Sequence, residues 1–263
     1  MENDYGSILT GINDFIGTIT FNNQLKLNAL SSAMLGEIID AFENFRKNKV
    51  RVVIIRAGKG SKVWSAGHDI NELPLDGIDP LGQEKPLEKM LKMVQEYPGP
   101  VIALIEGSVW GGACDLAITC DLAIGSPDCT FAITPAKIGV PYNASGILHF
   151  INRLGLSHAK EMFFTGSPVD AESALHFGII NHVIENDDIE SFTYKLAGKI
   201  AANSPLSIEV IKEQFRILTN AHPITPNAFE HIESLRRKVY CSDDYKEGIN
   251  AFKEKRKPSF KCK

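Results

Sequence analysis

The sequence lacks the cysteine pattern of a disulfide-stabilised or zinc-binding protein. Its 263 residues include five cysteines, an odd number without a C-x-x-C pair, so neither a disulfide framework nor a thiolate zinc site is predicted. His68 with Glu72 and His158 with Glu161 are isolated pairs, and we expect no metal site. This cysteine usage is typical of a reducing compartment, and we expect a cytoplasmic protein.

Long apolar runs and a surplus of basic residues are also missing. No stretch approaches the length of a membrane span, and no basic region followed by an apolar run marks a secretory signal. The formal net charge is −4, which predicts no footprint for nucleic acid. Neither a phosphate-binding P-loop nor a G-x-S-x-G nucleophile elbow occurs. We therefore expect no membrane or nucleic-acid partner.

Strand and helix patterns alternate in the first half of the chain. Residues 8–12 and 15–21 have the pattern of a hairpin, and apolar residues recur at helical spacing after Ser31 and Ser32, which suit an N-cap. Near-continuous apolar runs at 50–57, 101–105 and 121–125 indicate buried parallel strands. This order favours right-handed βαβ units.

The last part of the chain has helical patterns. Ser204-Pro205 and Thr225-Pro226 each place a capping side chain before a proline at the first helical position. Helices are predicted over 205–219, 226–240 and 243–256. We therefore divide the chain into an α/β core, residues 1–203, and a helical C-terminal region, residues 204–263. Pro74–Pro86 has no periodicity and is either a loop beside a site or a surface linker.

Two glycine-containing segments follow predicted strands. S-A-G-H-D-I occupies 65–70, and E-G-S-V-W-G-G-A occupies 106–113 and opens a helix. Glycines at such junctions expose unpaired N–H groups where the helix dipole is positive, at the strand ends where α/β sheets place their sites. A pair of N–H donors suits the growing negative charge of a thioester enolate, and each such donor is worth about 3–4 kcal/mol.

With F-K-E-K-R-K-P at 252–258, these segments resemble the motifs of the enoyl-CoA hydratase/isomerase (crotonase) superfamily. The resemblance extends from L-K-L-N-A-L at 25–30 to Pro258. It implies an α/β crotonase (ClpP-like) spiral of ββα units with a helical C-terminal trimerisation region, assembled as a homotrimer or a dimer of trimers. An acyl-CoA thioester would bind in an extended groove, with main-chain N–H groups of His68 and Gly112 as oxyanion donors. No cofactor is implied, because coenzyme A is part of the substrate.

The acidic residues of this family distinguish its reactions. Its hydratases carry two glutamates that activate water and supply a proton. Here the first position is Asp115, and the second stretch, F-A-I-T-P-A-K-I-G at 131–139, has no carboxylate. Loss of CO2 from a malonyl-type thioester leaves the enolate directly and needs no base. The glycine segments, T-P-A-K-I-G-V-P-Y-N at 134–143 and the ending at 250–258 resemble the methylmalonyl-CoA decarboxylase branch. We therefore expect conversion of methylmalonyl-CoA to propionyl-CoA, and of malonyl-CoA to acetyl-CoA as a further reaction.

The resemblance assigns roles position by position. Tyr142 and the His68 side chain would hold the substrate carboxylate, and Thr134 would line the acyl pocket. Residues assigned to substrate or CoA binding also include Lys26, Ala66, Gly67, Asp69, Ile70, Gly112 and Lys255. Lys255 either meets CoA phosphates, from a neighbouring subunit, or belongs to a solvated helix end. Two alternative functions stay open: an enoyl-CoA hydratase/isomerase with Asp115 as its sole acid/base, and a non-catalytic acyl-CoA-binding scaffold.

Overall fold

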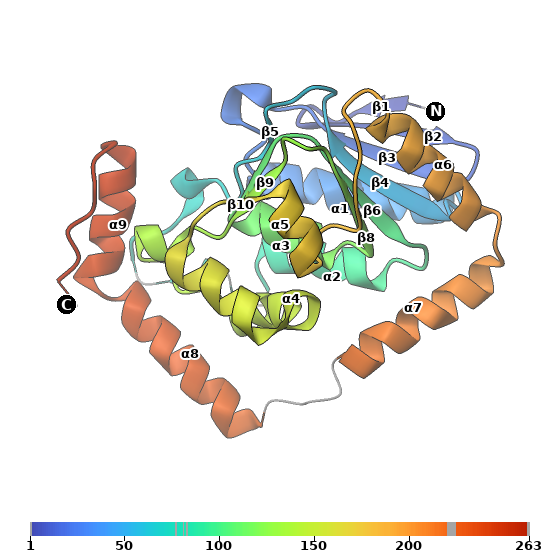
Figure 1. Ribbon diagram of the computed structural model, residues 1–263. Helices are drawn as coiled ribbons and strands as arrows, with labels where there is room; N and C mark the ends of the chain where they lie inside the picture. Colours follow the sequence, from blue (N-terminus) through green and yellow to red (C-terminus); the bar gives the residue numbers. More distant parts are fainter. Residues whose placement is uncertain (1, 77, 81, 83, 220–224, 262–263) are drawn as a thin grey trace.

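A seven-stranded sheet forms the centre of the computed structural model, which describes residues 2–76, 78–80, 82, 84–219 and 225–261. The strand order is β1-β2-β3-β4-β6-β8-β11; the hairpin β2–β3 is antiparallel, and the strands from β3 to β11 are parallel (Figure 1). The bounds are β1 Glu2–Asp4, β2 Ile8–Asn13, β3 Ile16–Phe21, β4 Val52–Ala57, β6 Val101–Ile105, β8 Leu122–Gly125 and β11 His182–Val183.

A second, four-stranded sheet has the order β10-β9-β7-β5. Its strands are β5 Val63–Ser65, β7 Ser108–Trp110, β9 Thr130–Ala132 and β10 Val169–Asp170. The chain passes from a strand of the large sheet to a strand of the small sheet and then to a helix, and it does so repeatedly. This is the expected spiral of ββα units. The simple βαβ reading was incomplete because the second strand of each unit has only three residues, too few for a period-2 pattern.

Helices cover both faces of the large sheet, and β4 is therefore buried on both sides. Val53 and Ile55 pack into the larger core together with α1, whereas Val52 and Ile54 pack against α6. The helices of the core region are α1 Ser32–Lys47, α2 Pro86–Glu96, α3 Gly112–Thr119, α4 Ala144–Thr165, α5 Ala171–Phe177 and α6 Ile189–Ala201; the 3₁₀ turns are η1 Gln24–Lys26, η2 Ile70–Glu72 and η3 Pro135–Ile138.

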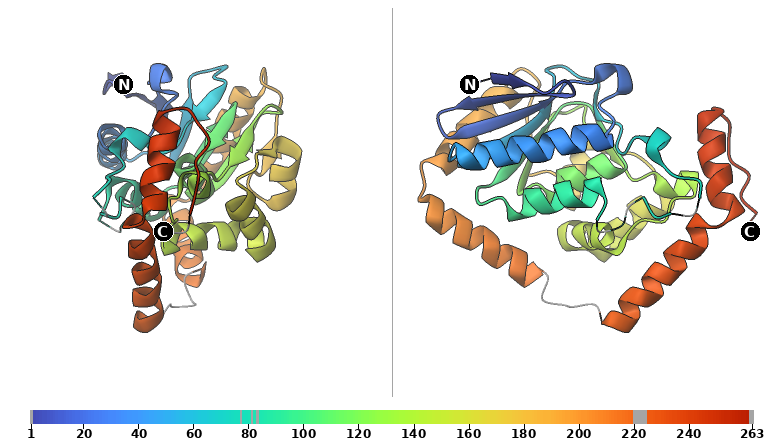
Figure 2. Two further views of the ribbon diagram at one scale, coloured as in Figure 1. Left: turned by 90° about the vertical axis from the view of Figure 1, so that its left-hand side faces the viewer. Right: turned by 180° about the vertical axis from the view of Figure 1, so that it is seen from behind.

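The C-terminal helices α7 Pro205–Thr219 and α8 Pro226–Tyr240 begin and end where the sequence predicts. Helix α9, Asp243–Lys253, ends before the predicted Arg256, because Lys255 adopts a left-handed φ of 54°. In Figures 1 and 2, α7 and α8 extend away from the core, and α9 returns to it. The α9 backbone packs directly on η3: a Cβ atom added at Gly248 would lie 2.2 Å from the Ile138 carbonyl oxygen. The division at residue 204 stays a prediction.

The cysteines that the structure describes, Cys114, Cys120, Cys129 and Cys241, are free thiols. Cys262 lies outside the described residues. Burial raises the pKa of Cys114, Cys120 and Cys129 well above that of an exposed thiol, so these three side chains are protonated members of the core.

Candidate active site

The two glycine-containing segments meet at the ends of neighbouring strands. β5 and β7 are parallel partners, and His68 follows β5 as Gly112 follows β7. A Cβ atom added at Gly112 would lie 3.6 Å from the His68 main-chain nitrogen, and one added at Gly67 would lie 3.1 Å from the Gly112 nitrogen. Among the described residues, neither the His68 nor the Gly112 N–H donates a hydrogen bond. Two adjacent N–H groups are therefore left for a ligand.

A small cavity of about 60 Å³ opens beside these N–H groups. It gathers six of the residues assigned to the site: Ala66, His68, Ile70, Gly112, Thr134 and Tyr142. The other lining residues are Leu73, Leu87, Gly111, Pro135, Ile138 and Val140. Among the residues that the structure describes, no carboxylate side chain lines the cavity, and most of its wall is apolar.

Four predicted site residues do not line this cavity. Gly67 lies behind its wall and is required by close packing, because a Cβ atom there would lie 2.4 Å from the Trp110 carbonyl oxygen. Asp69 caps η2 and pairs at 3.7 Å with Lys26, whose side chain is 63% exposed. Lys255 follows α9. Their assignment to coenzyme A binding stays a prediction.

The His68 side chain contributes an unpaired polar atom to the site. Its Nδ1 is buried and has no hydrogen-bond partner among the described residues. Burial lowers the pKa of His68, although Glu72 and Asp69 act in the opposite direction. The ring is therefore neutral at neutral pH and has one nitrogen available to a ligand.

Behind the cavity, Tyr142 begins a chain of buried polar contacts. Its hydroxyl donates to Oδ2 of Asp115 at 3.1 Å, and Nδ1 of His149 contacts Oδ1 of the same carboxylate at 2.7 Å. Nε2 of His149 lies 2.8 Å from the Gln95 amide nitrogen. Burial, followed by the charge and hydrogen bond of Asp115, raises the pKa of Tyr142 well above its usual value, so the phenol keeps its proton.

The position of Asp115 weakens the hydratase alternative. Its side chain is only 1% exposed, it does not line the cavity, and both of its oxygens are engaged. A general base must reach the substrate or its water, and this carboxylate reaches Tyr142 and His149 instead.

Comparisons with known proteins agree with this geometry. The enoyl-CoA hydratase/isomerase family model matches residues 11–263. The chain belongs to this family. It is 45% identical over 260 residues to the methylmalonyl-CoA decarboxylase of Escherichia coli (strain K12), covering 99% of each chain.

Solved structures of the same kind superpose closely on this family member. A methylmalonyl-CoA decarboxylase in complex with 2-nitronate-propionyl-CoA has a TM-score of 0.97 and 44% identity, covering 99% of this chain and 100% of the other. Another, complexed with 2S-carboxypropyl-CoA, has a TM-score of 0.96 at 44% identity and the same coverage. The predicted crotonase fold is thereby confirmed.

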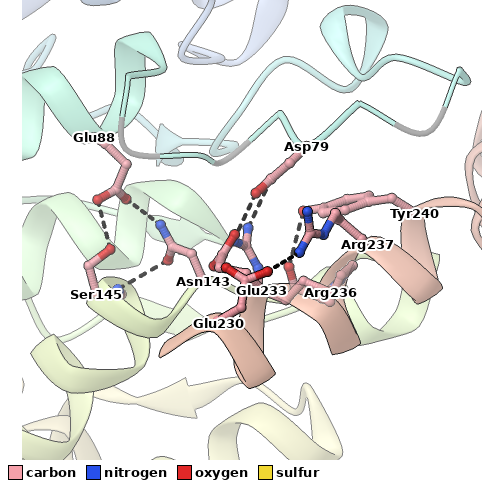
Figure 3. A network of polar contacts seen from close by, with 11 residues as sticks. Asp79, Glu88, Asn143, Ser145, Glu230, Glu233, Arg236, Arg237 and Tyr240 are labelled. Carbon is pink, nitrogen blue, oxygen red and sulfur yellow. Dashed lines mark hydrogen bonds and ion pairs between the residues drawn. The ribbon is translucent and has the colours of Figure 1, made fainter. Parts of the chain in front are cut away.

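A second carboxylate, absent from the sequence-based prediction, lies near the family's glycine segments in this chain. Glu88 in the first turn of α2 accepts hydrogen bonds from Asn143 at 2.6 Å and Ser145 at 2.8 Å, at the start of α4 (Figure 3). Burial raises the pKa of Glu88, and the charge of Asp115 raises it further, whereas the two hydrogen bonds act against this. Glu88 and its partners are 55 and 57 residues apart in sequence, so no local motif indicated the cluster.

The segment Pro74–Pro86 was predicted to be either a loop beside a site or a surface linker, and it lies beside the site. Its residues 77, 81 and 83 lie outside the described residues. Leu73 and Leu87, which flank it, both line the cavity. Arg236 of α8 pairs with Asp79 at 2.8 Å, and Figure 3 shows the guanidinium between the loop and the helix. The Tyr245 hydroxyl of α9 donates to the Pro74 carbonyl oxygen at 2.8 Å. The C-terminal helices therefore hold this loop against the core.

Within the described part of the chain, no cluster of three or more acidic, histidine or cysteine side chains could hold a metal ion. Nor does any described helix combine the length and apolar character needed to cross a bilayer.

Proposed function

We propose that this protein is a carboxy-lyase that converts methylmalonyl-CoA to propionyl-CoA and CO2. One observation carries the proposal: in the described part of the chain, two main-chain N–H groups without an acceptor flank a cavity that no carboxylate side chain lines. Such a cavity can stabilise an enolate but lacks the pair of carboxylates with which the family's hydratases activate water and supply a proton. The high identity to the decarboxylase of Escherichia coli supports the same reaction.

The proposed mechanism begins with the thioester oxygen between the N–H groups of His68 and Gly112. The bond between the α-carbon and the carboxylate breaks, its electrons form the enolate, and CO2 leaves as a neutral molecule. A proton taken from water then adds to the α-carbon and gives propionyl-CoA. Each N–H donor contributes on the order of 3 kcal/mol, because it is already oriented toward the oxygen on which charge develops.

The remaining assignments are part of the proposal. Tyr142 and His68 orient the substrate carboxylate, since both line the cavity and Nδ1 of His68 has no described partner. Thr134 borders the acyl group. Lys26, Ala66, Gly67, Asp69, Ile70 and Lys255 border the coenzyme A moiety. No cofactor is needed, because the thioester itself accepts the electrons.

A homotrimer or a dimer of trimers, in the cytoplasm, is the proposed state of the protein. Helix α7 supports an assembly because none of its residues is buried within the chain and several large apolar side chains are exposed. These are Leu206, Val210, Ile211, Phe215, Ile217 and Leu218. Sedimentation of a species near the 28.9 kDa of one subunit would contradict the assembly.

The activity is tested with methylmalonyl-CoA, malonyl-CoA and crotonyl-CoA as separate substrates. We expect CO2 and propionyl-CoA from the first. Absence of both products would refute the proposal; hydration of crotonyl-CoA would then indicate a hydratase, and tight binding without turnover a scaffold.

Replacement of Tyr142 tests the assigned site. Tyr142→Phe should lower kcat/KM about 10- to 100-fold, because a hydrogen bond to a charged group is worth about 1.5–3 kcal/mol. Tyr194→Phe is the matched control, since it also loses one hydroxyl contact, to Thr18 at 2.8 Å, away from the cavity. Equal rates for the two variants would remove Tyr142 from the mechanism.

A further inference from the structure

The Tyr142 hydroxyl has a single proton, and this proton is directed at Asp115. A substrate carboxylate can only accept hydrogen bonds, so Tyr142 can hold it only by turning its O–H away from Asp115. Asp115 then loses a donor in a place where its side chain is 1% exposed and water cannot replace that donor. Whatever else contacts Asp115 decides whether this exchange is favourable.

His149 is the residue in the right place. Its Nδ1 contacts the opposite oxygen of Asp115 at 2.7 Å, and the Thr119 hydroxyl donates to that oxygen at 3.4 Å. When the Tyr142 O–H turns to a ligand, His149 still contacts the Asp115 carboxylate. As an imidazolium, with the Gln95 amide turned so that its oxygen accepts from Nε2–H, it would also carry the one positive charge that contacts Asp115 among the described residues.

The charge balance around the cavity makes this positive charge necessary. A carboxylated acyl-CoA brings a further negative charge to a cavity that already has Asp115 behind Tyr142, and Glu88 lies close enough to act on both Asp115 and His149. Burial by itself lowers the pKa of His149, but the charge and hydrogen bond of Asp115, with Glu88, outweigh it and raise the pKa. Like charges in a poorly solvated site repel strongly unless a cation lies between them.

His149 can exchange its proton with solvent on its other side. There it lines a separate cavity of about 560 Å³, and its side chain is 17% exposed. The charged groups that line this second cavity are Asp121, Arg153, Lys212 and Arg216. Lys212 pairs with Asp121 and Arg216 with Glu213, whereas Arg153 donates hydrogen bonds to the main-chain oxygens of Gly178 and Asp121.

We propose that His149 is a positioning residue that makes the cavity selective for carboxylated acyl-CoA molecules, because its imidazolium balances Asp115 and frees the Tyr142 hydroxyl for the ligand carboxylate. This deepens the proposed function, on which it rests for the class of ligand. An acyl-CoA molecule that lacks a free carboxylate does not require the Tyr142 O–H to turn away from Asp115. Its affinity is therefore independent of His149.

The test compares two ligands by calorimetry at a series of pH values. 2S-Carboxypropyl-CoA carries the carboxylate but, as a carboxyalkyl compound, has no thioester carbonyl from which an enolate could form; propionyl-CoA has the thioester but no carboxylate. For the unmodified protein, the affinity for the carboxylated ligand should fall as pH rises through the His149 pKa, while the affinity for propionyl-CoA stays constant. Parallel behaviour of the two ligands would overturn the proposal without any variant.

Variants separate charge from structure. His149→Asn keeps a donor near the position of Nδ1 but cannot become positive, so it should bind the carboxylated ligand at least tenfold more weakly and propionyl-CoA within threefold of normal. The double variant Asp115→Asn/His149→Asn removes both charges and should regain most of the affinity. His158→Asn, on the same helix but bonded to the Leu154 carbonyl, is the control and should change neither. Equal weakening of both ligands in His149→Asn, or no recovery in the double variant, would indicate a merely structural role.

The binding experiment does not depend on turnover. If the protein released no CO2 from methylmalonyl-CoA, the proposed function would fail while the ligand difference could still be measured. If CO2 were released but the two ligands behaved alike, only the role of His149 would fail.

Discussion

A methyl group at Gly67 should disable the proposed enolate site without contacting the substrate. Gly67 has a φ of +83°, and a Cβ atom there would lie 2.4 Å from the Trp110 carbonyl oxygen and 3.1 Å from the Gly112 nitrogen. Even to reach 3.0 Å, the β7–α3 junction or the His68 loop must move by at least 0.6 Å. Either movement displaces one of the two N–H donors. Misplacing one such donor costs about 10²- to 10³-fold in kcat.

The same substitution also strains the backbone, and a matched variant separates the two effects. An alanine in the left-handed region costs roughly 1–2 kcal/mol. Gly60 has a similar φ of +71° with no atom within 4 Å of the added Cβ, so Gly60→Ala should lose comparable stability and keep its kcat. Urea unfolding gives the stability, and CO2 release from methylmalonyl-CoA gives kcat. A folded Gly67→Ala variant with kcat within threefold of that of Gly60→Ala would refute the reasoning.

Further predictions concern the C-terminal helices. Arg236→Ala should lower the free energy of unfolding by about 3 kcal/mol, because a guanidinium that is only 6% exposed pairs with both Asp79 and Glu233, and these part-buried carboxylates lose that cation. Arg237→Ala, at a side chain that is 62% exposed, should cost less than about 1 kcal/mol in the same urea titration. Thr225→Ala removes the N-cap of α8 and should lower the free energy of unfolding by about 1 kcal/mol, whereas Thr225→Ser keeps a capping hydroxyl and should retain most of that stability. Hydrogen bonds from Arg256 lower the pKa of Glu247 from 4.5 to about 2, so the stabilisation from this pair is complete above pH 4.5 and is lost as pH falls through 2. The protection of residues 243–261 against amide exchange, measured relative to the intrinsic exchange rate at each pH, should therefore fall over this acid range in the unmodified protein and show no such step in Glu247→Gln.

Most of the regular structure could be predicted because its signals are local. The apolar runs of β4 and β6 are buried at every position, and the Pro-initiated α7 and α8 have the predicted bounds. The short strands β7 and β9 could not be found this way. Their three residues each become a strand only because parallel neighbours pair with them.

By itself, the sequence determined the fold family and six of the twelve described residues that line the cavity, because its motifs resemble those of the enoyl-CoA hydratase/isomerase family. It also determined most helix and strand bounds, because capping and hydrophobic periodicity are properties of neighbouring residues. Only the tertiary structure decided what surrounds Tyr142: it placed Asp115 and His149 behind the phenol and Glu88 at the start of α4. These side chains come from three helices, and their protonation depends on burial and on one another's charge. Neither quantity exists until the helices have packed together.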